Sequence, residues 1–244
     1  MEVLNYIRRS WESYKENWMS FVVAELIVLT IVGIIGLIGI GIILSSAELS
    51  ALILLSPREF ISRIVSVLSL LEGVGKAFIF FVTSGLVWVF LKTGLYGMAA
   101  QALRGKTRVN TMFKVAKRMG LTGLLTCILV FIIGFFLMTI LVLGIGFIFP
   151  GGAVVGIILF LFMIILFSLI FPGIVVDRLD VIETIVMSIR IVKKNYFEMF
   201  SLILFYGILA LVISLIPVLG ALIVIFVLTP MVWISLVMFY KGKK

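Results

Sequence analysis

The hydrophobic and polar positions of this chain form two patterns, short amphipathic stretches and long apolar runs. Between Asp177 and Glu198, apolar side chains recur at alternating steps of three and four residues, which places them along one face of a helix. This seam consists of Ile182, Ile185, Ile189, Val192 and Tyr196. A long apolar run follows at once, so the pattern predicts an amphipathic surface helix that leads into membrane-spanning helices.

The same seam recurs twice more, which predicts internal repeats. Subtracting 178 from each residue number gives an N-terminal copy with Leu4, Ile7, Trp11, Tyr14 and Trp18. Three polar residues of that copy, Ser10, Lys15 and Asn17, match Ser188, Lys193 and Asn195. A third, more diverged copy contains Val109, Met112, Ala116 and Met119. The chain is therefore predicted to be a single membrane domain over residues 1–244, with parallel repeats at about 2–101, 107–176 and 180–240.

The long apolar runs predict six membrane spans arranged as three hairpins. They cover residues 19–44, 78–100, 121–149, 153–176, 199–216 and 218–240. Pro150-Gly151-Gly152 and Pro217 predict tight turns within two hairpins, and Thr229-Pro230 predicts a kink in the last span. The expected fold class is thus all-α, a polytopic transmembrane helical bundle of surface helices and hairpins.

Two features of the first hairpin predict local structure. Ser56-Pro57 followed by Glu59 has the spacing of a helix start, so a separate amphipathic helix of about fifteen residues is expected within a charged insertion at about 46–76, outside the cytoplasm. Gly33, Gly36 and Gly39 recur every three residues in the first span. Small residues on one face let another helix approach, so helix packing is expected there rather than a pore lining, although the glycines fit both.

Composition identifies the class of protein and excludes several kinds of chemistry. The hydrophobic content is 64%, against about 45–50% in soluble domains, which indicates an integral membrane protein of the plasma membrane. The chain has no His and a single cysteine, Cys127, which excludes a His/Cys metal site, a disulfide within the chain and a Ser-His-Asp triad. Nucleotide-binding glycine motifs are also absent. We therefore expect no catalytic residues, no metal and no cofactor, and a protein that is not an enzyme.

The basic residues are distributed unevenly about the six-span model. Of the twenty Lys and Arg residues, seventeen fall on the side of the two termini and three on the other side, so both termini are expected to be cytoplasmic. The net charge of +9 flanks apolar spans, which favours anionic membrane lipid over nucleic acid as the partner. The residues expected to bind lipid headgroups are Arg104, Lys106, Arg108, Lys114, Lys117, Arg118, Lys193 and Lys194.

Two charged residues, Glu25 and Lys92, lie inside apolar runs. Each is about 10–14 Å from the cytoplasmic end of its span at 1.5 Å per residue, and an isolated charge in lipid costs about 2.5–3.5 kcal/mol or more. We therefore expect them to form an ion pair inside the bundle. The pair has two interpretations, a contact that only fixes helix packing or part of a polar binding site. Residues on the second span that would extend such a cavity are Thr93, Tyr96 and Gln101.

Two stretches resemble a known family. They are Gly94-Leu95-Tyr96-Gly97 with Ala102-Leu103-Arg104-Gly105-Lys106, and Val175-Val176-Asp177 with Ser188, Lys194 and Asn195. They are similar to the recurring pattern of uncharacterised prokaryotic six-span membrane proteins, a group that includes the membrane domain found beside glycerophosphodiester phosphodiesterase domains. The resemblance implies a compact helical bundle with amphipathic connectors on the cytoplasmic side. It implies no active site, because this sequence contains no phosphodiesterase domain.

Two functions of different classes fit these patterns. One is the handling of a lipid or small amphipathic solute through an intramembrane polar site around Glu25 and Lys92. The other is a membrane scaffold whose basic surface helices bind anionic lipid or a partner protein. A continuous polar cavity that reaches the two charges would favour the first function, and a dry, tightly packed centre would favour the second.

Overall fold

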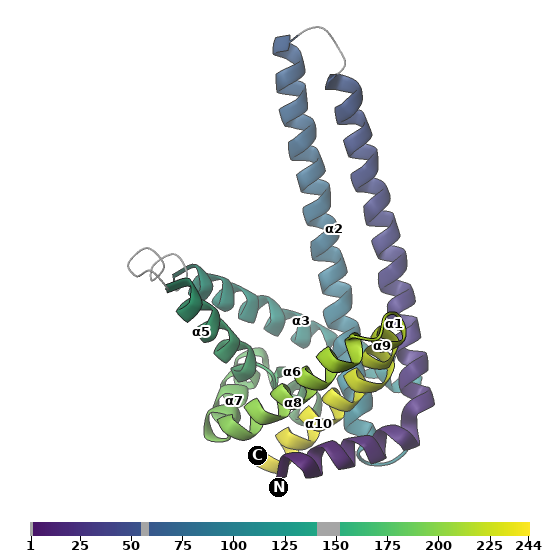
Figure 1. Cartoon of the computed structure of the whole chain (residues 1–244), viewed down its shortest axis with the longest axis vertical. Helices are drawn as coiled ribbons and strands as arrows, with labels where there is room; N and C mark the ends of the chain where they lie inside the picture. Colours follow the sequence, from purple (N-terminus) through teal and green to yellow (C-terminus); the bar gives the residue numbers. More distant parts are fainter. Residues whose placement is uncertain (1, 55–58, 141–151) are drawn as a thin grey trace. The chain divides into compact units, whose positions relative to one another are not determined.

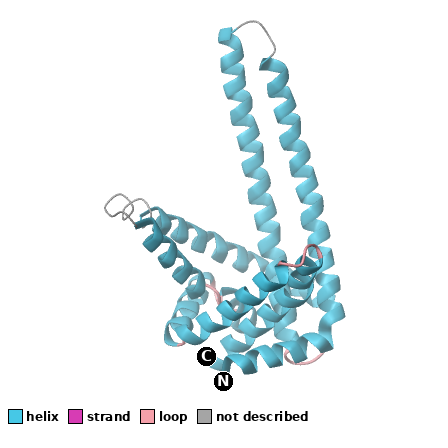
Figure 2. Ribbon diagram, viewed as in Figure 1, coloured by secondary structure: helices cyan, strands magenta, loops and turns pink. Residues whose placement is uncertain are grey.

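The computed structural model describes residues 2–54, 59–140 and 152–244, and all regular structure within these ranges is helical (Figure 2). The prediction of an all-α chain is thereby confirmed. The chain forms two compact units, unit 1 (Met1–Glu25 and Val89–Lys244) and unit 2 (Leu26–Trp88). Two long helices, α1 (Glu2–Leu54) and α2 (Glu59–Ala102), each contribute residues to both units (Figure 1).

The other helices belong to unit 1. They are α3 (Val109–Thr139), α5 (Gly152–Leu166), α6 (Ile170–Asp177), α7 (Val181–Lys194), α8 (Tyr196–Ser214), α9 (Leu219–Ile223), the π-helical turn η2 (Val224–Leu228) and α10 (Thr229–Lys243). Within the described residues, four segments are long and apolar enough to cross a membrane. They are Glu2–Gly41, Val109–Leu137, Tyr196–Ser214 and Leu219–Lys243. A shorter apolar stretch, Leu161–Asp177, covers the end of α5 and all of α6.

The core of unit 1 surrounds α10. Half of the most apolar stretch of Leu219–Lys243 is buried, against 22% or less in the other three long segments, so α10 is central and the others present apolar side chains outward. Where α2, α6 and α10 meet, the ring of Tyr96 stacks on Phe171, with 5.1 Å between centroids, and lies 5.9 Å from Trp233. This aromatic contact holds together three elements that are far apart in sequence.

The π turn η2 lies immediately before Pro230, at the position where the sequence predicts a kink. Proline has no N–H, so the carbonyl of Phe226, four residues earlier, loses its α-helical donor. The hydroxyl of Tyr14 on α1 donates to that carbonyl instead, at 2.9 Å, and the Thr229 hydroxyl donates to the carbonyl of Val224 at 2.8 Å. The irregularity at Pro230 therefore takes the form of a π turn whose carbonyls are bonded by side chains.

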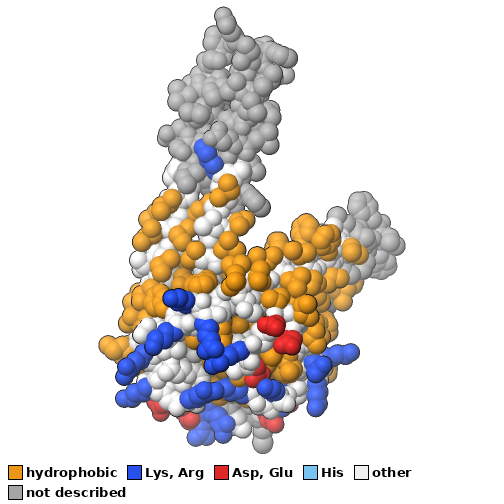
Figure 3. All heavy atoms as spheres, turned by 180° about the vertical axis from the view of Figure 1, so that it is seen from behind, with side chains coloured by type: hydrophobic (Ala, Val, Ile, Leu, Met, Phe, Trp, Pro, Cys, Tyr) orange, Lys and Arg blue, Asp and Glu red, His pale blue; other side chains and the backbone are white. Residues whose placement is uncertain are grey.

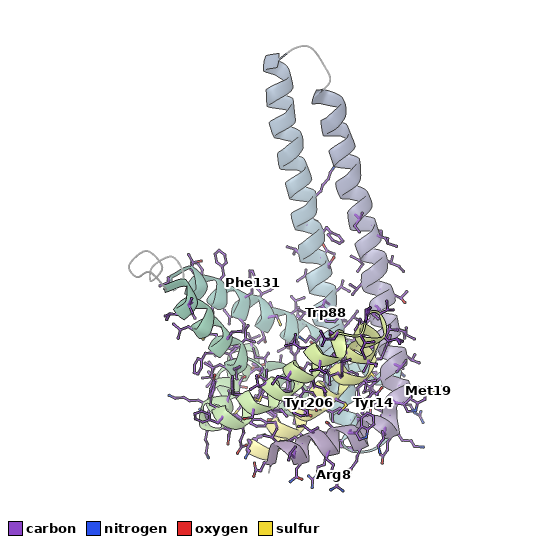
Figure 4. The ribbon with its side chains drawn as sticks, viewed as in Figure 1. Arg8, Tyr14, Met19, Trp88, Phe131 and Tyr206 are labelled. Atoms are coloured by element: carbon purple, nitrogen blue, oxygen red, sulfur yellow. The ribbon has the colours of Figure 1, made fainter. Side chains whose placement is uncertain are left out.

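A chain of buried hydroxyls joins α1, α8 and α10. The Tyr206 hydroxyl lies 2.9 Å from Ser10 Oγ and 2.7 Å from Ser235 Oγ, and all three residues are at most 4% exposed. Tyr206 and Tyr14 point into the packed part of unit 1, whereas Arg8 points away from it (Figure 4). The N-terminal part of α1 is thus fixed to the two C-terminal helices through polar contacts that are fully satisfied.

Both ends of the chain meet in unit 1. The ammonium group of Lys243 forms ion pairs with the carboxylates of Glu2 and Glu198, the latter at 2.9 Å. Its hydrogen bond to Glu2 holds the pKa of that carboxyl below its usual value. Glu2 is the first residue of α1, Glu198 lies in the first turn of α8 and Lys243 is the last residue of α10, so these ion pairs join the two ends of the chain at the polar end of the unit.

The predicted apolar seams are only partly buried. In α7, Ile185 and Val192 are buried, whereas Ile182 is 69% exposed. In the N-terminal copy, Tyr14 is buried but Leu4, Trp11 and Trp18 are 43–66% exposed. The face that is buried instead carries Ser10, Tyr14, Asn17 and Phe21. The small polar residues point inward, where they have hydrogen-bond partners. Apolar side chains that point outward lose no stability next to lipid, because the lipid tails are as apolar as they are.

Several expected helix boundaries are wrong. The surface helix and the span form one continuous helix in α1 and again in α3, and only α7 is separated from its following span, at Asn195. The helix expected from Ser56 is not separate either, because α2 runs unbroken from Glu59 to Ala102; Ser56 and Pro57 lie outside the described residues. The expected span at 153–176 is broken between α5 and α6.

The break between α5 and α6 is stabilised by side chains. The Ser168 hydroxyl donates to the carbonyl of Ile165 at 2.7 Å, and the buried Ser188 hydroxyl of α7 donates to the carbonyl of Leu166 at 2.7 Å. Carbonyls at a helix end need partners of this kind when they are buried. The break therefore depends on a residue from α7, which local sequence does not indicate. The turn at Pro217 is confirmed between α8 and α9, and the turn at Pro150 lies outside the described residues.

Unit 2 consists of the middle of α1 and the first part of α2. Gly39 on α1 lies against the ring of Phe80 on α2, so closely that a Cβ at this glycine would overlap the ring. A shallow apolar cavity of about 260 Å³ lies between the same helices, lined by Ile35, Ile38, Lys76, Ile79, Phe80 and Thr83.

Candidate anion-binding site

A polar pocket of unit 1 lies where α2, α3, α6 and α10 meet at their polar ends. Its volume is about 660 Å³, and the Lys and Arg side chains of unit 1 gather at this end of the unit (Figure 3). We call it the cationic pocket. Its basic lining residues are Arg104, Lys106, Lys114, Arg178 and Lys241, and its other lining residues are Gly97, Ala100, Gln101, Gly105, Thr111, Val115, Val175 and Val176. None of these is acidic, so the lining carries only positive charge.

The loop between α2 and α3 supplies two of the cations. Gly105 adopts a φ of +140°, which side chains larger than glycine rarely accept, and it turns the chain between Arg104 and Lys106. Asn17 on α1 fixes the loop, because its side-chain oxygen accepts the Thr107 N–H at 2.7 Å and its amide donates to the carbonyl of Gly105 at 3.4 Å. The two basic side chains therefore start from a backbone that is held in place.

Gln101 connects the end of α2 to the start of α3. Its side-chain oxygen accepts hydrogen bonds from the hydroxyls of Thr111, at 2.5 Å, and Thr107, at 3.3 Å. With the oxygen occupied by these two donors, the amide nitrogen of Gln101 is the group left to interact with a ligand in the pocket. An amide N–H₂ is a hydrogen-bond donor, which suits an anion.

The first turns of α3 form one wall of the pocket and favour negative charge. Arg108 is at the N-cap position, but no side chain caps the helix and its first turn contains no acidic residue. The amino end of a helix carries the positive end of the macrodipole and unpaired N–H groups, so it attracts anions. Thr111 and Lys114 line the pocket from these turns. The Thr111 hydroxyl donates its proton to Gln101, so the ammonium group of Lys114 is the positive group that this wall offers.

Arg178 and Lys241 complete the lining from distant parts of the chain. Arg178 ends α6 in the left-handed conformation, with a φ of 57°, which is unfavourable for a residue with a side chain. The adjacent Asp177 does not neutralise it, because its carboxylate accepts the Tyr240 hydroxyl at 2.6 Å and pairs with Lys244 at 2.8 Å. Lys241 follows the apolar part of α10, and burial, together with the neighbouring charge of Arg104, lowers its pKa.

The predicted headgroup-binding residues are divided by the structure. Of the eight, Arg104, Lys106 and Lys114 line the cationic pocket. The others, which are exposed and do not line it, are Arg108, Lys117, Arg118, Lys193 and Lys194. Arg178 and Lys241 were missed as members of the site. Only their basic character was visible in the sequence, because their place in the pocket depends on tertiary packing.

The expected ion pair between Glu25 and Lys92 is not formed in the structure. Glu25 is 3% exposed, but the ion pairs among the described residues do not include it. The ammonium group of Lys92 lies 5.1 Å from the ring centroid of Phe171 on α6. The equal depth of the two residues therefore did not decide the pairing, because Lys92 faces α6.

Thr93 and Tyr96 are packing residues in this structure. The Thr93 hydroxyl donates to the carbonyl of Val89 at 2.9 Å, within α2, and the residue has no exposed surface. Tyr96 is 4% exposed and stacks on Phe171. Of the three residues expected to line a cavity, Gln101 is the one that reaches a pocket. In the described part of the chain, no group of three or more His, Cys, Asp or Glu residues is placed to hold a metal ion.

Comparison with protein-family models, curated proteins and solved structures finds no match for this chain. The resemblance to six-span prokaryotic membrane proteins accordingly stays a prediction. The function has to be argued from the geometry of the pocket.

Proposed function

We propose that this chain is a multi-pass membrane protein that binds the phosphate headgroups of anionic lipids in the cationic pocket. One observation carries the proposal: five basic side chains from four segments of the chain line one pocket to which no acidic residue contributes. Like charges held together without a counter-charge repel each other, and a bound anion relieves that repulsion. The role is one of binding, as in a membrane scaffold, and requires no catalytic group.

The proposal includes the six-span arrangement, with both termini on the cytoplasmic side of the plasma membrane. The four long apolar segments and the gathering of basic residues at one end of unit 1 support it. The matched positions of the repeats support it as well. Ser10 and Ser188 are both fully buried, and the amides of Asn17 and Asn195 each donate, at 3.0 Å, to the carbonyl four residues earlier.

Packing around Lys92 favours this binding role over passage of a solute through the bundle. Leu95 and Met98, on the following turns of α2, have no exposed surface, and the ring of Tyr96 is stacked against Phe171. A route for a polar solute would need space and polar groups along this part of the helix. The aromatic and aliphatic contacts fill it instead.

The test compares Lys114, which lines the pocket, with Lys117, which lies one turn further along α3 and does not. The purified protein in detergent would be titrated with phosphatidylglycerol or phosphatidylcholine, and bound lipid counted by native mass spectrometry. A basic residue near an anionic headgroup contributes about 1 kcal/mol, so Lys114→Gln should weaken phosphatidylglycerol binding about fivefold. Lys117→Gln should change it much less. Equal losses in both variants would indicate diffuse attraction to the surface and would contradict a defined pocket.

A further inference from the structure

The short helix α7 carries apolar side chains on two separate parts of its surface. One part is packed against unit 1 and the other is exposed. We infer that the exposed part is a membrane-binding surface, and that α7 lies in the boundary between the headgroups and the acyl chains of an anionic membrane. The inference uses no residue of the cationic pocket, so it goes beyond the proposed function and does not depend on it.

Both ends of α7 lie at the polar end of unit 1. Asp177, four residues before the helix begins, pairs with Lys244 at 2.8 Å. Glu198, four residues after the helix ends, pairs with Lys243 at 2.9 Å, and these two lysines are adjacent in the chain. With 14 residues α7 is about 21 Å long, so it runs along the polar end of the unit and does not cross the membrane (Figure 1).

One face of α7 packs against the rest of unit 1. At about 100° per residue, its buried residues fall within an arc of about 120°. They are Thr184, Ile185, Ser188, Ile191 and Val192. Ser188 gives the direction of this arc, because its hydroxyl donates to the carbonyl of Leu166, the last residue of α5, at 2.7 Å. The rotation of α7 about its own axis is therefore determined by these contacts.

The exposed surface of α7 divides into an apolar edge and a charged edge. Ile182 and Val186 form the apolar edge and are 69% and 48% exposed. The charged edge, turned from it by about 80°, carries Glu183, Arg190 and Lys194, which are all exposed. The apolar edge thus lies between the packed face and the charged edge. This order is expected of a helix that has protein on one side, acyl chains below it and water above it.

Two observations favour lipid over a partner protein as the cover of the apolar edge. The neighbouring helices in unit 1 also present apolar side chains outward, since Leu161 on α5 is 54% exposed and Phe197 at the start of α8 is 83% exposed. Lys193 follows Ile182 along the apolar edge in the last turn of α7. A lysine there can lay its stem along the acyl region and reach an anionic headgroup with its ammonium group.

The experiment measures the depth of nitroxide labels on the full chain in vesicles of phosphatidylcholine and phosphatidylglycerol. Cys127→Ser removes the single cysteine, and one new cysteine is then introduced and labelled in each variant. Electron paramagnetic resonance reports collisions with oxygen, which enters the acyl region, and with a nickel chelate, which stays in water. Labels in Ile182→Cys and Val186→Cys should collide mainly with oxygen, about 5–10 Å below the headgroups. Labels in the matched variants Glu183→Cys and Arg190→Cys should collide mainly with nickel.

Two results would overturn the inference. Access of nickel to all four labels would show that the whole exposed surface of α7 faces water. Protection of the labels at positions 182 and 186 from both reagents would show that a protein surface, such as a second copy of this chain, covers the apolar edge.

A second pair of variants keeps the inference testable if Cys127→Ser does not fold. In the unaltered background, Ile182→Asn places an amide in the acyl region and should lower the unfolding temperature in lipid nanodiscs, whereas Glu183→Asn should leave it unchanged. Equal unfolding temperatures of the two variants would contradict the inference. Neither experiment bears on the cationic pocket, which Lys114→Gln tests separately.

Discussion

The glycines of α2 and α3 in unit 1 differ from the glycine ladder of α1 in unit 2 in what lies opposite them. A Cβ at Gly94 would overlap the main-chain carbonyl of Met112, and one at Gly97 would overlap the side chain of Val115. The contact is reciprocal. On α3, Gly120 lies against Phe90 and Gly123 against Thr93.

In unit 2 the same residue type has mostly open space around it. At Gly33 and Gly36 no described atom lies within 4 Å of the Cβ position, and of the three ladder positions Gly39 alone meets a neighbour, the ring of Phe80. A glycine therefore permits a close helix contact without causing one. The contact forms where both helices present glycines and each glycine receives a larger residue of the other helix, as α2 and α3 do for each other. This close approach also sets the walls of the cationic pocket.

The largest loss of stability is expected for a substitution at Gly94. In Gly94→Ala the added methyl group presses on a backbone carbonyl that cannot move without shifting α3, so the free energy of unfolding should fall by about 1–3 kcal/mol. Thermal unfolding of the purified variant in detergent measures the loss. An unfolding temperature equal to that of the wild type would show that α2 and α3 are not in close contact at Gly94.

A smaller effect is expected at Gly123, because its neighbour is a side chain. A Cβ there would overlap the hydroxyl of Thr93, so Gly123→Ala should cost about 1 kcal/mol of unfolding free energy. Adding Thr93→Ala removes that hydroxyl and should restore most of the loss, as a double-mutant cycle would reveal. Strictly additive losses would mean that the two residues do not touch, and would reopen a role for Thr93 as a cavity residue.

The smallest effect is expected at Gly36, which is also the control for Gly94. With open space at its Cβ position, Gly36→Ala gains helix propensity and meets no obstacle, so stability should be unchanged or higher by up to about 1 kcal/mol. The same unfolding measurement applies. A clear loss of stability would show that another surface packs against this face of α1.

The sequence predicted what depends on local pattern and missed what depends on partners. Apolar length predicted the helical class, and Pro217 and Thr229-Pro230 marked two real irregularities. The helix break after Leu166 was missed because it depends on a distant residue. The Leu166 carbonyl accepts a hydrogen bond from Ser188, twenty-two residues later. In the N-terminal copy of the seam, periodicity did not indicate that Ser10 is buried, because its partner Tyr206 is brought to it only by the folded chain.

The site follows the same division. Arg104, Lys106 and Lys114 lie in one basic segment, so the sequence predicted them together. Arg178 and Lys241 are separated from that segment by sixty residues or more, and only the packing of α6 and α10 against α2 and α3 brings them to the pocket. The pairing of Glu25 with Lys92 was predicted from equal depth. Depth is a local property, but the direction in which a side chain faces is not, and Lys92 faces Phe171.

The π turn η2 changes which residues of the last apolar run share one face of the helix. Each residue advances an α-helix by about 100°, and a π turn contains one residue more than an α turn, so helical phase is not preserved across Val224–Leu228. Trp233, Val237 and Tyr240, all buried, belong to a phase that begins only after this turn. A single helical wheel over residues 219–243 would therefore mix two angular registers. Two wheels, joined at Thr229, describe this helix.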